Sequence, residues 1–368
     1  MEFEVNREDL IKALGAAEKA TAGKQMAVLG NVLIKAECGV VEILGYNLSL
    51  AVFARIPAAI KESGSVLLAA GQVSAFLAKC ADRSVNVSTE GDKAVIKCGR
   101  SKVTFICPPA DDFPEPRSIE KGANEITVDL ATFSSAVSAV IYAAADISSR
   151  EVLQAVNISF DKVGRIRLTG CDGLRAASCK YDSGKTGADC DFNILKADLK
   201  TALQIIEGNK IVIRYSKSDI EFVEEDGRTV RTRLCSADYP EVGQMMKKSF
   251  AAAKQLIKLS AEELGELLKK LLALPKESIE APTRLNFDND RLTVVYDFKS
   301  GCFIEEIPCE LSGNPFTVGV RATFLAEMIK GATGEIMLGC DGSEGAVTLE
   351  QGHVRRMFMP MRLRNGLS

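Results

Sequence analysis

The chain has 368 residues, 46% of them hydrophobic and 26% charged, and its 46 basic and 49 acidic side chains give a formal net charge of −3. This length exceeds that of one ordinary domain, and no run approaches the roughly 20 apolar residues that span a bilayer, which argues against a membrane partner. The charge balance excludes a protein that grips nucleic acid mainly through phosphate contacts, because such proteins are clearly basic. The N-terminus alternates apolar and polar residues and shows no signal-peptide pattern, so we expect a cytoplasmic protein.

A short apolar strand followed by an amphipathic helix recurs six times along the chain. We expect these pairs at residues 3–5 and 7–20, 66–68 and 71–81, 126–128 and 130–144, 192–194 and 196–207, 256–259 and 261–273, and 316–318 and 321–332. Successive strands are about 60 to 66 residues apart, and such a fixed step indicates a repeated architecture. Within the helices, apolar residues such as Leu199, Leu203 and Ile206 share one face, which should pack on a sheet.

Further strand-like segments, such as residues 94–98 and 102–107, lie between the helices and are separated by turn signals. Each repeat therefore contains one strand, one helix and about three more strands, and two repeats make one domain. We predict an α+β fold with three similar domains, at residues 1–122, 123–245 and 246–368.

The side chains that usually carry metal or catalytic chemistry are scarce. Eleven cysteines occur without a Cys-x-x-Cys spacing, His353 is the single histidine, and there is no tryptophan. Buried free thiols are the expected state of the cysteines in a reducing compartment. We find no pair of acids, nucleophile or metal cluster, and so predict no enzyme activity, no metal and no cofactor.

The segment of residues 357–363, Met-Phe-Met-Pro-Met-Arg-Leu, has two interpretations. A final strand that ends at a proline is one of them. The other is a surface groove for apolar peptides, because methionine is flexible and polarizable and adapts to varied partners.

Residues 359–363 resemble the C-terminal signature of the bacterial DNA sliding clamp family, the beta subunits of DNA polymerase III. Similar segments occur at residues 29–34, 99–101, 112–114 and 171–175, so the resemblance runs in register from residue 1 to 363. It implies the clamp fold, with three domains per chain closing head to tail as a homodimer into a ring of six domains. The implied function is to encircle duplex DNA and confer processivity on the replicative DNA polymerase. A peptide-binding groove would also serve the clamp loader and the repair and translesion polymerases.

The resemblance implies site residues position by position. The partner-peptide groove would comprise Leu153, Cys171, Gly173, Leu174, Arg175, Ala176, Gln244, Met245, Phe324, Val347, Met359, Pro360, Met361 and Arg362. DNA contacts would come from Lys24, Arg150 and Lys196, and the dimer interface from Lys102, Phe105, Leu271, Leu272 and Leu274. Five groove positions depart from the family. Leu174 stands in place of His, Phe324 in place of Tyr, Gln244 in place of Pro, Cys171 in place of Thr and Ala176 in place of Leu.

Two alternatives stay open at the level of sequence. A clamp-like paralogue or decoy would bind the same partner peptides without being loaded on DNA. An enzyme of an unrecognised class is disfavoured because no catalytic constellation is present.

Overall fold

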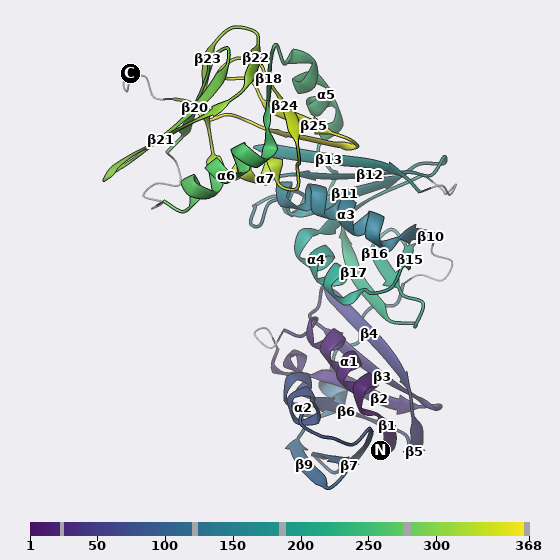
Figure 1. Cartoon of the computed structure of the whole chain (residues 1–368). Helices are drawn as coiled ribbons and strands as arrows, with labels where there is room; N and C mark the ends of the chain where they lie inside the picture. The colour runs from purple at the N-terminus through teal and green to yellow at the C-terminus, as the bar shows by residue number, and fades with distance from the viewer. Residues whose placement is uncertain (23–25, 120–123, 184–188, 275–280, 364–368) are drawn as a thin grey trace. The chain divides into compact units, whose positions relative to one another are not determined.

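The computed structural model describes residues 1–22, 26–119, 124–183, 189–274 and 281–363 (Figure 1). The chain forms two compact units, Met1–Ser134 with Ala197–Ser236, and Ser135–Lys196 with Ala237–Ser368. Helix α3 (Leu130–Val140) contains one boundary between the units, and α4 (Lys196–Ile205) begins at the other. In the described ranges, no helix is long and apolar enough to cross a membrane.

The first unit contains two antiparallel sheets. The five-stranded sheet has the order β5 (Ala59–Glu62), β1 (Glu2–Asn6), β7 (Ser84–Glu90), β8 (Lys93–Cys98) and β9 (Ser101–Ile106). The longer sheet has the order β6 (Gly64–Leu68), β2 (Val32–Glu37), β3 (Val40–Tyr46), β4 (Leu50–Pro57), β17 (Thr229–Cys235), β16 (Asp219–Val223), β15 (Lys210–Tyr215) and β10 (Asn124–Asp129).

The pairing of β4 with β17 joins the predicted first and second domains in one sheet. Leu50 pairs with Thr232 and Phe53 with Thr229. The buried carboxylate of Asp198 on α4 stabilises this junction, since the Ser49 and Thr232 hydroxyls donate to its Oδ2 at 2.5 and 2.6 Å. Buried polar groups paired in this way avoid the cost of an unsatisfied carboxylate.

The second unit also contains two antiparallel sheets. The longer one has the order β14 (Cys190–Leu195), β11 (Ala155–Phe160), β12 (Arg165–Cys171), β13 (Arg175–Asp182), β26 (Val354–Phe358), β25 (Val347–Gln351), β24 (Glu335–Cys340), β18 (Gln255–Ser260) and β22 (Glu310–Ser312). The four-stranded sheet has the order β21 (Gly301–Pro308), β20 (Arg291–Phe298), β19 (Thr283–Phe287) and β23 (Phe316–Val320).

A second junction of the same kind joins β13 to β26. Arg175 pairs with Phe358 and Cys179 with Val354. In both junctions, the last strand of one predicted domain is added to the sheet of the domain before it.

All six predicted strand–helix pairs are present. The other helices of these pairs are α1 (Arg7–Glu18), α2 (Ala70–Leu77), α6 (Ala261–Leu272) and α7 (Ala322–Ile329). Local sequence accounts for their ends: the Asn6 side chain caps α1 by accepting from the Glu8 amide at 2.8 Å, and the Ser260 hydroxyl caps α6. Leucines of α6 and α7 bury one face in the core between the sheets of the second unit.

A seventh helix, α5 (Val242–Ala252), occupies a segment that we predicted to be a domain boundary. The predicted boundary after residue 245 therefore falls inside a helix. The boundary after residue 122 lies outside the described residues, and the division into three domains stays a prediction.

Candidate functional site

The hairpin between β12 and β13 presents Leu174 at the surface. Gly173 adopts a φ of +92°, a conformation that favours glycine, and the Asp172 carboxylate accepts from the amides of Leu174 and Arg175 at 2.9 Å each. The Leu174 side chain is left 51% exposed at the tip of this turn.

The C-terminal segment lies against this hairpin. The Met359 amide donates to the Leu174 carbonyl at 2.7 Å, and the Met359 side chain is 42% exposed. The Met361 amide then donates to the Gly319 carbonyl on β23 at 2.7 Å, where an added Cβ on Gly319 would lie 2.6 Å from the Met361 oxygen. The methionines are thus positioned by backbone bonds at two points, and Leu174 and Met359 lie next to each other at the surface.

Arg175, which follows Leu174, forms several side-chain contacts. Its Nε lies 2.9 Å from an Asp172 carboxylate oxygen, and its Nη1 pairs with Glu327 on α7. The guanidinium also stacks over the ring of Phe324 at 4.3 Å, and Phe324 is only 8% exposed. Arg175 and Phe324, both predicted groove residues, therefore contact each other, and Phe324 is buried.

Helix α5 covers the part of the predicted groove formed by Cys171 and Ala176. Both are buried in an apolar cluster with Val242 and Met246 of α5 and with Met357. Both side chains are therefore covered within this chain, and their place in the partner-peptide groove stays a prediction. Val347 is likewise buried, in the core beneath α7.

The remaining predicted groove residues lie at the surface. Leu174, Met245 and Met359 are exposed large apolar side chains, and Leu153, Pro360 and Met361 are half-buried. Gly173, Gln244 and Arg362 are exposed as well. We refer to Leu174, Met245, Met359, Pro360 and Met361 as the apolar surface. Solvent-exposed apolar side chains of this size suit a binding site for a partner.

Three apolar residues of α5 that pack beside this site, Val242, Met246 and Phe250, were not among the predicted groove residues. Val242, Met246 and Phe250 recur at four-residue steps and pack on the sheet, and this spacing is a helical signal that could have identified α5.

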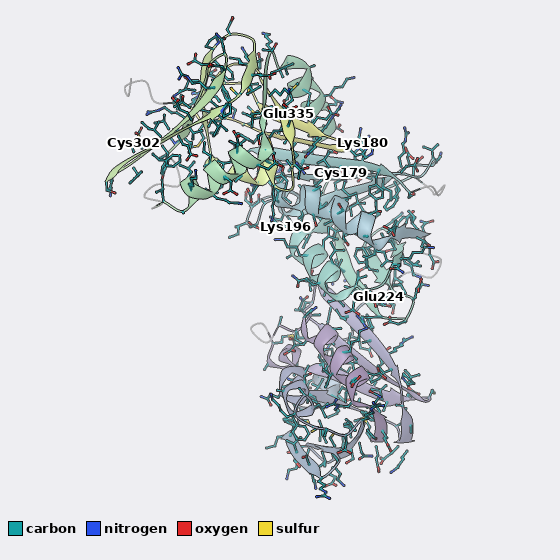
Figure 2. The ribbon with its side chains drawn as sticks, in the orientation of Figure 1. Cys179, Lys180, Lys196, Glu224, Cys302 and Glu335 are labelled. Carbon is teal, nitrogen blue, oxygen red and sulfur yellow. The ribbon has the colours of Figure 1, made fainter. Side chains whose placement is uncertain are left out.

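The three predicted DNA contacts differ in their surroundings. Lys24 lies outside the described residues, and Arg150 is exposed before the short helix η4 (Glu151–Gln154). Lys196 is buried, and its Nζ donates to the Ala144 carbonyl at 2.8 Å and pairs with Asp146 at 2.8 Å (Figure 2). This burial argues against the predicted contact of Lys196 with DNA.

The predicted dimer-interface residues also differ in their exposure. Lys102 is exposed and Phe105 half-buried on β9, which is an edge strand of its sheet. Leu271 is 4% exposed within the core of the second unit, because it lies on the buried face of α6. It is therefore a core residue, whereas Leu272 and Leu274 stay partly exposed.

Comparison with known proteins finds similar sequences. Residues 1–117 match the family described as DNA polymerase III beta subunit, N-terminal domain. The beta sliding clamp of Streptomyces coelicolor is 25% identical over 89% of this chain and 87% of its own length, and that of Escherichia coli K12 is 21% identical over 99% and 100%.

Solved structures are similar over the whole chain. The DNA polymerase III beta subunit of Pseudomonas aeruginosa has a TM-score of 0.90 at 19% identity, covering 99% of this chain and 100% of that one. The Bacillus subtilis sliding clamp also has a TM-score of 0.90, at 16% identity and 99% coverage of both chains. These structures share the α+β fold of the chain, and this is the clamp fold that the resemblance implied. Residues 1–117 thus match the N-terminal domain of the DNA polymerase III beta subunit, and the whole chain shares the fold of solved beta sliding clamps.

Proposed function

We propose that the protein is a DNA sliding clamp that encircles duplex DNA and tethers the replicative DNA polymerase through the apolar surface. The observation that carries this proposal is the match of fold and sequence to beta sliding clamps along almost the entire chain. A clamp catalyses no reaction. It raises the effective concentration of the polymerase at the primer end by preventing its escape from DNA.

The order of strands supports closure into a ring. Strands β4 and β13 occupy corresponding places in the first two predicted domains, and each pairs with the last strand of the following domain. The corresponding strand of the third predicted domain is β21, and the last strand of the first is β9, and both are edge strands. Pairing of β21 with β9 of a second copy would repeat the junction and close a head-to-tail homodimer.

Charge supports topological attachment to DNA. A formal net charge of −3 is unfavourable for a protein that must hold duplex DNA by phosphate contacts alone. A ring that surrounds DNA needs no strong attraction. In this proposal the protein works in the cytoplasm, where a clamp loader opens it and repair and translesion polymerases share the apolar surface with the replicative polymerase.

Deletion of residues 359–368 tests the proposed peptide site. The apolar surface should anchor a Leu or Phe of a partner peptide, and burial of one such side chain contributes about 1.5–3 kcal/mol. We expect the deletion to weaken binding of a labelled partner peptide more than tenfold in a fluorescence titration. The dimer should persist, since β9 and β21 lie outside the deleted segment. Wild-type affinity in the deletion variant would exclude this site.

A paralogue or decoy that is never loaded on DNA is the second candidate. It would also bind the peptide, so only retention on DNA distinguishes it from a working clamp.

A further inference from the structure

A basic cavity lies on the face of the second unit's longer sheet that α5 covers. Arg167 on β12 is directly opposite Lys180 on β13, and Arg355 on β26 is opposite Ser178 on the same face. The cavity between these strands and residues 239–247 has a volume of about 500 Å³. Lys247 of α5 completes its set of cations (Lys180 is labelled in Figure 2).

Most of these cations have no counterion from the chain itself. Within the described part of the chain, Arg167, Lys180 and Lys247 form no ion pair, whereas Arg355 pairs with Glu350 at 2.8 Å. Like charges at directly opposite positions destabilise a sheet. Desolvation, and then the nearby Arg167 and Arg355, lower the pKa of Lys180. An anion in the cavity would relieve this repulsion.

Neutral donors line the same cavity. The hydroxyls of Thr169 and Ser178 lie 3.4 Å apart, and Ser159 also lines the wall. The cavity has two acids of its own, Asp191 and Glu241, and the Asn157 amide donates to Asp191. Four cations against two acids leave a net charge of +2, which suits a small number of carboxylates.

Helix α5 contributes residues to both the cavity and the proposed peptide site. Gln244 and Met246 line the cavity, and Met246 also packs on Cys171 and Ala176 beside the apolar surface. The pair Arg167 and Lys180 is four residues along the strands from the pair Cys171 and Ala176, a distance of about 13 Å at 3.3 Å per residue.

We propose that this basic cavity binds an acidic segment of the partner peptide whose apolar residues dock beside Leu174 and Met359. The inference rests on the proposed function of the apolar surface. One carboxylate fits the planar guanidinium of Arg167 as a bidentate pair. Asp191 and Glu241 would repel a continuous chain of phosphates, which favours a peptide over nucleic acid. The spacing places the acids about four extended residues from the apolar anchor.

The test uses two pairs of twelve-residue fluorescein-labelled peptides. Within each pair, one peptide contains Glu-Glu and the other contains Gln-Gln, and a Leu-Phe anchor lies four and five residues away. The two pairs differ in whether the anchor precedes or follows these residues. In one order, the Glu peptide should bind the full-length protein at least tenfold more tightly than its Gln partner, measured by anisotropy at low salt. The double variant Arg167→Gln, Lys180→Gln should abolish this difference and leave the affinity for the Gln peptide unchanged.

Arg165→Gln is the matched control, because Arg165 is on the same strand but pairs with Asp161 at 2.7 Å and does not line the cavity. It should preserve the tenfold difference. Equal affinities of Glu and Gln peptides in both orders would overturn the inference, as would a difference that survives in the double variant. Displacement of the Glu peptide by a twelve-nucleotide single strand at lower concentration than by unlabelled peptide would overturn it in favour of nucleic acid.

A hexaglutamate peptide, which has no apolar anchor, separates this inference from the proposed function. If the Gln peptides fail to bind, the proposal of the peptide site is wrong. Calorimetry with hexaglutamate then measures whether the cavity by itself binds acidic residues. Binding that the double variant loses would support the cavity, and absence of binding to wild type would overturn it.

Discussion

Glu224 has a carboxylate whose charge changes near neutral pH. It lies after β16 with its side chain 5% exposed, accepts from the Glu207 amide at 2.6 Å, and is 3.6 Å from Nε of Arg228 (labelled in Figure 2). Burial raises the pKa of Glu224 to about 7, although the Glu207 amide and Arg228 act in the opposite direction. Arg228 also pairs with Asp226 at 3.3 Å, so its charge is shared.

The free energy of unfolding should depend on the ionisation of Glu224. A raised native pKa means that the protonated carboxyl favours folding, so this contribution is present below about pH 4.5 and is lost as the pH rises through 7. Through Glu224, the free energy of unfolding of the wild type should fall by up to about 3 kcal/mol between pH 5 and 8, and Glu224→Gln should not show this fall. The variant should therefore melt at a higher temperature than wild type at pH 8.

Glu225→Gln is the control, because Glu225 is exposed beside the cluster. It should follow the wild-type dependence on pH. An unchanged pH dependence in Glu224→Gln would show that Glu224 is ionised without cost in the folded protein.

At the level of single residues, the sequence predicted which segments lie together better than which side chains are exposed. Leu174 and Met359 are adjacent at the surface, and Met361 follows them. Cys171 and Ala176 lie on the strands that flank the Leu174 turn but are buried, because their exposure depends on the packing of α5 against them. Strand alternation determines the face of a residue but not what packs on that face.

Among the elements, α5 has the greatest consequence for function. Its Val242 and Met246 pack on the sheet, while Met245 is 40% exposed at the apolar surface. From the sequence we predicted a domain boundary here, after residue 245. The six helices that follow apolar strands were predictable, since the repeat provides six independent examples of one pattern.

Met246→Ala should loosen α5 from the sheet. Replacement of a buried methionine by alanine costs about 2–5 kcal/mol, and the small apolar cluster under α5 places this site near the lower end. Hydrogen exchange of the α5 amides should accelerate while the amides of β11 to β13 stay protected.

Met245→Ala is the matched control on the same helix, because Met245 contributes to the exposed surface and not to that cluster. Its α5 amides should exchange at the wild-type rate. Equal exchange in the two variants would contradict the docking of α5 through Met246.

For the whole molecule, the edge strands determine how copies can associate. Ile106 on β9 is 79% exposed and Ile304 on β21 is 64% exposed, and unpaired apolar edges of this kind promote association. The sequence indicated β9 as an interface strand but not β21. The reason is that an edge is recognised only when the order of strands in the sheet is known.

Ile304→Lys should convert the proposed dimer into a monomer. Lysine on an edge strand opposes pairing with another strand, and the exposure of Ile304 in the single chain means that folding should be unaffected. Light scattering at micromolar concentration should give about twice 39.6 kDa for wild type and 39.6 kDa for the variant. Val163→Lys, at a similarly exposed position away from both edge strands, should remain dimeric. A monomeric wild type would contradict closure.

Retention on circular DNA distinguishes a closed ring from an ordinary DNA-binding protein. The protein, loaded by a clamp loader onto nicked circular duplex DNA, is separated from free protein at a salt concentration that abolishes ordinary phosphate contacts. A ring should remain on the circle and leave once the DNA is linearised, because it slides off an open end. Equal loss from circular and linear DNA, with steep dependence on salt, would contradict the account.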